Sequence, residues 1–217
     1  MNSLPGDREP LPLPLTAIVL CGGKSKRMGR TKAFLPYGGT TMIAHIVDQI
    51  GEMFSKTLLV SNEPDLYGDF EHDVVKDILP YRGPMGGILS GLLVAETEYS
   101  FVIACDMPLV SKKLVRDMTA ARNGYDVVVL SHSSGLEPLF AVYSKSCIKP
   151  LEESLFAGTL SVQDLIGGLK STTFKYDESK YDQDVLPPYF NINTPQDYSK
   201  LITKGSSSVH QFPEKRK

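Results

Sequence analysis

Hydrophobic residues form short runs that alternate with segments of helical spacing. The segment 15–20 (LTAIVL) is almost wholly apolar, as in a strand buried on both faces, whereas 41–54 places its apolar side chains three and four residues apart. Strands are expected at residues 15–20, 57–60, 100–104, 126–130, 139–143 and 172–176. Helices are expected at 41–54, 85–95, 111–121, in a segment ending near 156, at 161–166, and from Thr194 onward.

The alternation of strands and helices predicts an α/β fold. We expect a single three-layer α/β/α domain with a mostly parallel sheet covered by helices on both faces. In such folds ligands bind outside the carboxyl ends of the strands. The segments that follow the strands are therefore the candidate binding loops, namely 21–32, 61–64, 105–108 and 131–138.

The composition changes at both ends of the chain. Residues 1–14 contain four prolines and predict a flexible leader. Residues 204–217 are polar and rich in Ser and Lys, which predicts a disordered tail. The folded domain is therefore expected at 15–203.

Charge and cysteine content argue against several classes of protein. A net charge of −2 does not suit a nucleic-acid-binding surface, and no apolar run approaches the ~20 residues that span a membrane. Cys21, Cys105 and Cys147 are widely spaced, which argues against a disulfide framework and against a cysteine zinc site. Reduced thiols in a cytoplasmic protein are the expected state.

A glycine-rich, basic loop follows the first predicted strand. Residues 20–32 are LCGGKSKRMGRTK, with three glycines, five basic residues and no acidic residue. Glycines let main-chain N–H groups approach an oxyanion, and Lys and Arg supply charge to phosphate. The spacing does not match the Walker A or the dinucleotide-binding pattern. The loop predicts polyphosphate binding; the alternative is a basic surface turn.

This loop resembles the signature of the MobA-like nucleotidyltransferases, a family with the GT-A-like nucleotidyltransferase fold. The positions that match in register are Leu20, Gly22, Gly23, Ser25, Arg27, Met28, Gly29 and Lys32. The resemblance covers about 15–201. Two departures are small: Cys21 stands where Ala is usual in the family, and Cys105 precedes the acidic residue of the next motif.

The resemblance implies roles for three polar residues that follow later strands. Asp106, in the segment CDMP, corresponds to the family's Mg²⁺-binding carboxylate, and Mg²⁺ prefers one or two carboxylates plus phosphate oxygens. Asn62 resembles a residue that contacts the base or ribose, and Asp77 one that contacts the nucleotide, where a carboxylate suits the adjacent N–H donors of guanine. For Asp106 and Asn62 the alternative is a plain turn residue.

Three further segments match the family more loosely. The run 83–87 (GPMGG) resembles a turn before a helix, and Glu137-Pro138 resembles a polar-Pro pair that opens a strand. Asn191 and Asn193 lie in a segment, NINTP, that could help to hold metal or acceptor. Helix capping alone accounts for the Thr-Pro pair that ends it.

The histidines form no catalytic or metal-binding pattern. His45 is expected to be partly buried on a helix, and His132 to lie in a loop without a partner at metal-ligand spacing.

The resemblance implies transfer of GMP from GTP to the phosphate of molybdenum-bearing molybdopterin, with Mg²⁺ as cofactor and pyrophosphate as product. Arg27 and Lys32 would stabilise the departing phosphates and Asp106 would hold the metal. Nucleotide contacts are expected from Leu20, Cys21, Gly22, Gly23, Lys32, Asn62, Asp77 and Asp106. Molybdoenzyme maturation proteins are possible partners; nucleic acid and membranes are not expected.

Alternatives remain open from the residues alone. The loop is shared with molybdopterin cytidylyltransferases and sugar-phosphate nucleotidyltransferases. A non-catalytic nucleotide-binding module is a third reading, and it would be expected to lack the metal carboxylate.

Overall fold

The computed structural model describes residues 11–22, 31–181 and 186–204. Gly23, Arg27, the tail from 205 onward and most of the expected leader lie outside these residues. The strands are β1 Leu13–Leu20, β2 Pro36–Tyr37, β3 Thr40–Thr41, β4 Phe54–Ser61, β5 Asp73–Lys76, β6 Tyr99–Ala104, β7 Val127–His132, β8 Gly135–Ser144 and β9 Ser171–Lys175. The helices are α1 Met42–Gly51, α2 Pro84–Val94, α3 Lys112–Ala120, α4 Ile148–Phe156, α5 Val162–Gly167, α6 Glu178–Tyr181 and α7 Pro195–Lys204.

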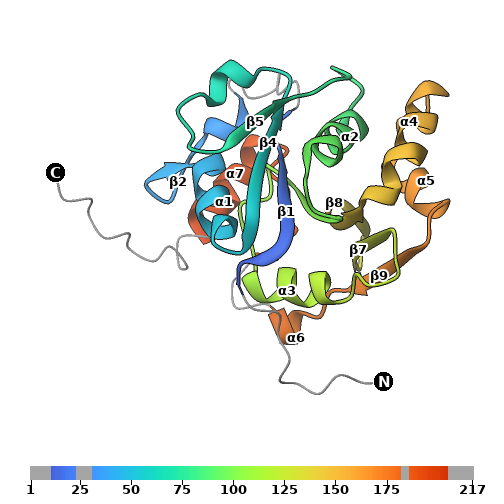
Figure 1. Cartoon of the computed structure of the whole chain (residues 1–217). Coiled ribbons are helices and arrows are strands. Elements are labelled where there is room, and N and C mark those ends of the chain that lie inside the picture. The colour runs from blue at the N-terminus through green and yellow to red at the C-terminus, as the bar shows by residue number, and fades with distance from the viewer. Residues whose placement is uncertain (1–10, 23–30, 182–185, 205–217) are drawn as a thin grey trace.

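The central sheet has seven strands in the order β5-β4-β1-β6-β8-β7-β9 (Figure 1). Its neighbours pair in parallel except at β8, which is antiparallel to both β6 and β7. The mostly parallel sheet is therefore confirmed. Because β8 runs against its neighbours, its first residues lie at the same edge of the sheet as the carboxyl ends of β6 and β7.

Helices cover both faces of this sheet. Successive side chains of β1 point to opposite faces, so Ala17 and Val19 join one buried cluster and Ile18 and Leu20 the other. The first cluster includes side chains of α1 and α3, and the second includes side chains of α2, α4 and α5. The three-layer α/β/α fold is thereby confirmed. None of the helices in the described residues has the length and apolar character to cross a membrane.

Some element boundaries differ from those expected. The helix predicted to reach residue 54 ends at Gly51, because Phe54 already begins β4 and pairs with Leu13 of β1. That pairing also starts β1 two residues inside the expected leader. The short edge strand β5 and the β2–β3 hairpin were not predicted.

A third, smaller hydrophobic cluster packs α7 and the segment before it against β2 and α1. Tyr37 of β2 and Met42 of α1 pack with Ile192 and with Leu201 of α7. The predicted capping box is formed, since Asp197 N–H donates to Thr194 Oγ1 at 3.1 Å and Thr194 N–H donates to Asp197 Oδ2 at 2.9 Å. The cluster and the cap bring residues 191–193 to the carboxyl edge of the sheet.

Candidate active site

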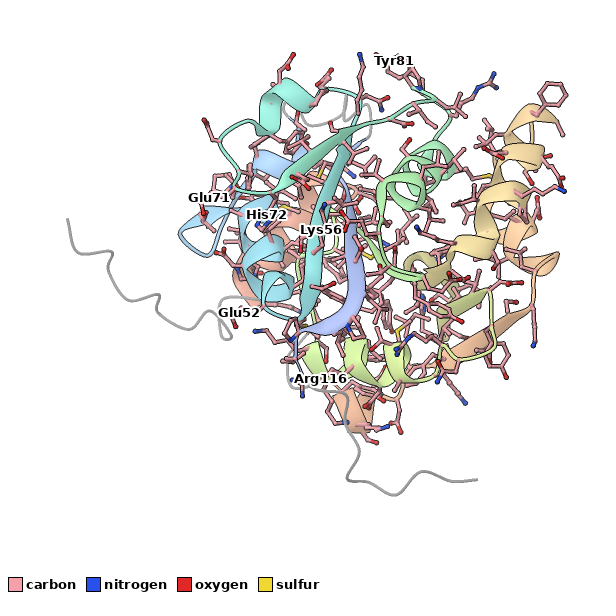
Figure 2. All side chains as sticks on the ribbon, viewed as in Figure 1. Glu52, Lys56, Glu71, His72, Tyr81 and Arg116 are labelled. Atoms are coloured by element: carbon pink, nitrogen blue, oxygen red, sulfur yellow. The ribbon has the colours of Figure 1, made fainter. Side chains whose placement is uncertain are left out.

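A cleft of about 740 Å³ opens at the carboxyl ends of β5, β4, β1 and β6. This is the place where open α/β sheets bind ligands. Seven residues proposed from the sequence line it: Leu20, Cys21, Gly22, Lys32, Asn62, Asp77 and Asp106. Gly23 and Arg27 lie outside the described residues. Figure 2 shows Tyr81, another lining residue, at the end of the molecule opposite Arg116 of α3.

Lys32 links two parts of the cleft that are distant in sequence. Its Nζ lies 3.4 Å from Asp106 Oδ2 and donates to Asn193 Oδ1 at 3.0 Å. The N–H of Ile192 donates to the carbonyl of Asp106 at 3.0 Å. The ammonium group of Lys32 therefore lies between the end of β6 and the NINTP segment.

Burial raises the pKa of Asp106 above its ordinary value, and the neighbouring Lys32 ammonium opposes that rise. The carboxylate is partly buried and would gain from a second cation. The ammonium already occupies a position between a carboxylate oxygen and an amide oxygen, which marks this corner as a place for positive charge.

The donor set around Asp106 fits Mg²⁺ held jointly with a ligand. Within the described residues no group of three or more His, Cys, Asp or Glu side chains could form an all-protein metal site. Mg²⁺ does not need such a site, because one or two carboxylates with phosphate oxygens and water satisfy it. Asp106 would supply the carboxylate, and Asn193 Oδ1 is a further oxygen at the same corner.

Gly22 and Asn62 lie close together in one wall of the cleft. A Cβ on Gly22 would lie 3.4 Å from Asn62 Nδ2, so glycine leaves this side of the cleft open. Asn62 Oδ1 is buried and has no hydrogen-bond partner in the described residues. An unsatisfied buried acceptor is unfavourable by about 1–3 kcal/mol, so Asn62 is suited to accept a bond from a ligand.

The two cysteines of the cleft, Cys21 and Cys105, are buried thiols. Burial raises the pKa of the Cys105 thiol to about 12 and also raises the pKa of Cys21 well above its ordinary value. Both therefore stay protonated and behave as small apolar residues. Tyr67 fixes the main chain at this point by donating its hydroxyl to the carbonyl of Cys21 at 3.0 Å.

Asp77 follows β5 and is held by its surroundings. Its Oδ1 accepts from the N–H of Leu79 at 3.0 Å and from the hydroxyl of Ser90 at 3.1 Å. Burial raises the pKa of Asp77, and these two hydrogen bonds act against the rise. Gly86 is required next to it, because a Cβ there would lie 2.9 Å from the carbonyl oxygen of Leu79 and 3.1 Å from Asp77 Oδ1.

His132 was expected in a loop, but it lies in β7 and has a hydrogen-bond partner in β8. Its Nε2 lies 3.0 Å from Glu137 Oε1, and Ser134 N–H donates to its Nδ1 at 3.2 Å. Tyr189 stacks on the ring at 4.0 Å, and Asn191 Nδ2 approaches Glu137 Oε2 at 3.5 Å. The strand reversal between β7 and β8 creates this pair, so sequence reasoning missed it. His45, expected to be partly buried, is 6% exposed on α1.

Comparison with known proteins identifies the family. A family model for the MobA-like NTP transferase domain matches residues 17–172. A probable molybdenum cofactor guanylyltransferase of Pelotomaculum thermopropionicum is 36% identical over 196 residues, covering 90% of this chain and 96% of the relative. One of the same name from Carboxydothermus hydrogenoformans is 35% identical over 188 residues, covering 87% and 95%.

A solved structure supports the fold. Molybdopterin-guanine dinucleotide biosynthesis protein A from Archaeoglobus fulgidus superposes with a TM-score of 0.74 at 24% identity, covering 86% of this chain and 96% of that one. The family model spans most of the chain and the relatives are matched over nearly their full length. This chain therefore belongs to the MobA-like NTP transferase family.

Proposed function

We propose that this protein transfers GMP from GTP to the phosphate of molybdenum-bearing molybdopterin and releases pyrophosphate. The observation that carries the proposal is the cleft shared by Lys32, Asp106 and Asp77, which brings one cation and two carboxylates together. The relatives named molybdenum cofactor guanylyltransferase support the choice of nucleotide and acceptor.

The reaction exchanges one phosphorus–oxygen bond for another. An oxygen of the acceptor phosphate bonds to the α-phosphorus of GTP, and the bond to the bridging oxygen breaks, so that pyrophosphate leaves with the electron pair. The acceptor phosphate is already anionic near neutral pH, because its second pKa is about 6, so no strong general base is needed. Repulsion between the two anions is the main barrier, and alignment and charge neutralisation lower it.

Lys32 is the residue proposed to neutralise the β- and γ-phosphates as pyrophosphate leaves. Its present contacts, a loose 3.4 Å ion pair and one amide oxygen, leave ammonium protons for phosphate oxygens. Arg27 and the main-chain N–H groups of Gly22 and Gly23 are proposed to share this task.

Asp106 is the residue proposed to hold Mg²⁺, with Asn193 as a neighbouring oxygen donor. Bound there, Mg²⁺ supplies Lewis-acid stabilisation of charge on the phosphate oxygens. A non-catalytic module would have no need for the Lys32–Asp106 pair.

The remaining lining residues are proposed to hold the nucleoside. Asp77 would accept from the base, Asn62 would use its unsatisfied amide oxygen, and Leu20 and Cys21 would contact the nucleotide along the end of β1.

A nucleotide panel tests this function. Pyrophosphate release is measured with GTP, CTP, ATP and UTP in the presence of Mg²⁺, with and without molybdenum-bearing molybdopterin. We expect release only with GTP and the acceptor. Preference for CTP would identify a cytidylyltransferase, turnover with a sugar phosphate would identify a sugar-phosphate nucleotidyltransferase, and binding without turnover would identify a non-catalytic module.

Two related expectations stay predictions, namely the cytoplasmic location and binding of molybdoenzyme maturation proteins. Cell fractionation and affinity purification of the full chain with an apo-molybdoenzyme would test them.

A further inference from the structure

Helix α2 contains one buried hydroxyl among apolar side chains. Its sequence, PMGGILSGLLV, is otherwise Gly, Pro, Met and aliphatic residues, and Ser90 in its second turn is 0% exposed. A buried hydroxyl is unfavourable unless it is hydrogen-bonded, so its presence in this helix calls for a partner.

Ser90 bonds to the segment that carries Asp77. The N–H of Ile78 donates to Ser90 Oγ at 3.0 Å. The hydroxyl hydrogen faces two acceptors, Asp77 Oδ1 at 3.1 Å and the carbonyl of Gly86 at 2.8 Å. Ser90 therefore connects the middle of α2 to the loop that follows β5.

As a result, the two carboxylate oxygens of Asp77 differ in their hydrogen bonding. Oδ1 accepts from Leu79 N–H and lies within hydrogen-bond distance of the Ser90 hydroxyl, whose hydrogen it shares with the Gly86 carbonyl. Oδ2 has no hydrogen bond from the described residues, and Asp77 lines the cleft. Gly86 allows this arrangement, since a Cβ there would lie 3.1 and 3.3 Å from the two carboxylate oxygens.

We propose that Ser90 is a positioning residue that anchors Asp77 Oδ1 and so directs Oδ2 toward the nucleobase. The inference rests on the proposed function, in which Asp77 contacts guanine. Guanine offers two adjacent donors, N1–H and the 2-amino group, and a fixed carboxylate distinguishes it from a base that lacks the amino group. Ser90 acts through Asp77 and does not itself touch the substrate.

The test compares GTP with ITP, whose base lacks the 2-amino group. Dissociation constants are measured calorimetrically with Mg²⁺ for the wild type, Ser90→Ala and the matched control Ser100→Ala. Ser100, in β6, is also 0% exposed, but its hydroxyl has no hydrogen-bond partner in the described residues. The ratio of the two constants does not depend on the fraction of folded protein, so reduced yield of a variant cannot mimic the effect.

We expect the wild type and Ser100→Ala to favour GTP over ITP by about tenfold, the effect of one hydrogen bond to a charged group. In Ser90→Ala the preference should fall to about twofold or less, mainly through weaker GTP binding. A wild-type GTP preference in Ser90→Ala, combined with its loss in Asp77→Asn, would overturn the role of Ser90 and leave the proposed function intact.

Two other outcomes would also overturn the inference. Equal affinity of the wild type for GTP and ITP would show that Asp77 does not read the amino group. A wild type that binds neither nucleotide, or that prefers CTP, would refute the proposed function itself, and the nucleotide panel would reveal this separately.

Discussion

Carboxylates at the two edges of the central sheet differ in how many of their oxygens are hydrogen-bonded within the protein. At the amino edge, Asp126 uses both oxygens within the protein: Oδ1 accepts from the hydroxyl of Ser146 at 2.5 Å and Oδ2 from the N–H of Lys170 at 3.0 Å. At the carboxyl edge, Asp77 keeps Oδ2 without a hydrogen bond from the described residues, and Asp106 has one loose ion pair. Both oxygens of Asp126 are therefore used within the fold, whereas Asp77 and Asp106 line the cleft.

The hydroxyl groups follow the same division. Near the amino edge, Thr97 Oγ1 accepts from the N–H of Thr16 at 2.9 Å and donates to the carbonyl of Tyr99 at 2.8 Å, which closes the network. At the carboxyl edge, the hydroxyl of Ser90 contacts Asp77 Oδ1, and Asp77 Oδ2 has no hydrogen bond from the described residues. Substitutions at the two edges should therefore affect different measurements.

The largest effect is expected for Asp106→Ala. Transfer should fall by about 10²- to 10³-fold or more, because the proposed metal carboxylate is lost. The melting temperature should change little, since burial raises the pKa of Asp106 and its charge is not favoured by folding. Pyrophosphate release and thermal unfolding of the same preparation measure both quantities. Release at the wild-type rate would refute the role of Asp106, whereas some nucleotide binding should survive.

Lys32→Ala should lower the rate of transfer by about 10²-fold, because one preorganised charge at the leaving phosphates is removed. Its effect on unfolding should be small, since an ion pair near the surface contributes about 0–1 kcal/mol. Lys32→Arg is the control that keeps the charge and should retain more activity than Ala. A large loss of melting temperature with normal specific activity would place Lys32 among the structural residues instead.

At the amino edge, a substitution should lower the stability of the protein and leave the rate of transfer near wild type. Asp126→Ala removes the hydrogen bonds from the hydroxyl of Ser146 and from the N–H of Lys170, so we expect a loss of about 1–2 kcal/mol in the free energy of unfolding. The kinetics of transfer should stay near wild type, because β7 separates this residue from the cleft. Urea unfolding measures the stability of the variant, and steady-state kinetics measure its rate of transfer. A variant with wild-type stability and impaired transfer would contradict the distinction between the edges.

Local patterns in the sequence predicted the layers of the fold and the ends of β1, β4 and β6 in the cleft, but not the end of β5. The apolar run of β1 and the helical spacing of α1 are properties of consecutive residues, which a sequence displays directly. The half-exposed edge strand β5 has only four residues and no such pattern. The antiparallel direction of β8 follows from the tight reversal at Gly135, whose φ of 134° favours glycine.

The site could be proposed only where its residues lie in loops after strands. Lys32 and Asp106 were placed by this rule, but the hydrogen bond from Lys32 to Asn193 joins residues 161 positions apart. Ser90 and the His132–Glu137 pair depend on packing between elements. A single polar residue in the apolar segment 85–95 was the one available signal for Ser90.

The smallest effect is expected for Thr194→Ala, which tests the cap that Thr194 and Asp197 form at the start of α7. Loss of this cap should lower the free energy of unfolding by about 1 kcal/mol. Hydrogen bonds from the hydroxyl of Thr194 and from the N–H groups of Asn193 and Thr194 lower the pKa of Asp197. A carboxylate with a lowered folded-state pKa stabilises the protein above its unfolded-state pKa of about 3.9, and this contribution is lost as pH falls through the folded-state value.

Urea unfolding of the wild type and Thr194→Ala at pH 7 and at successively lower pH measures this dependence. The difference between the two proteins should be full at pH 7 and should narrow below about pH 4, where protonation of Asp197 weakens the cap in the wild type as well. Asp197 Oδ2 also accepts from the N–H of Asn193 at 3.1 Å, so the variant should show a slight fall in transfer as the contact of Asn193 with Lys32 loosens. A difference in stability that stays constant from pH 7 to pH 3 would mean that the Thr194 hydroxyl stabilises the helix independently of the Asp197 carboxylate.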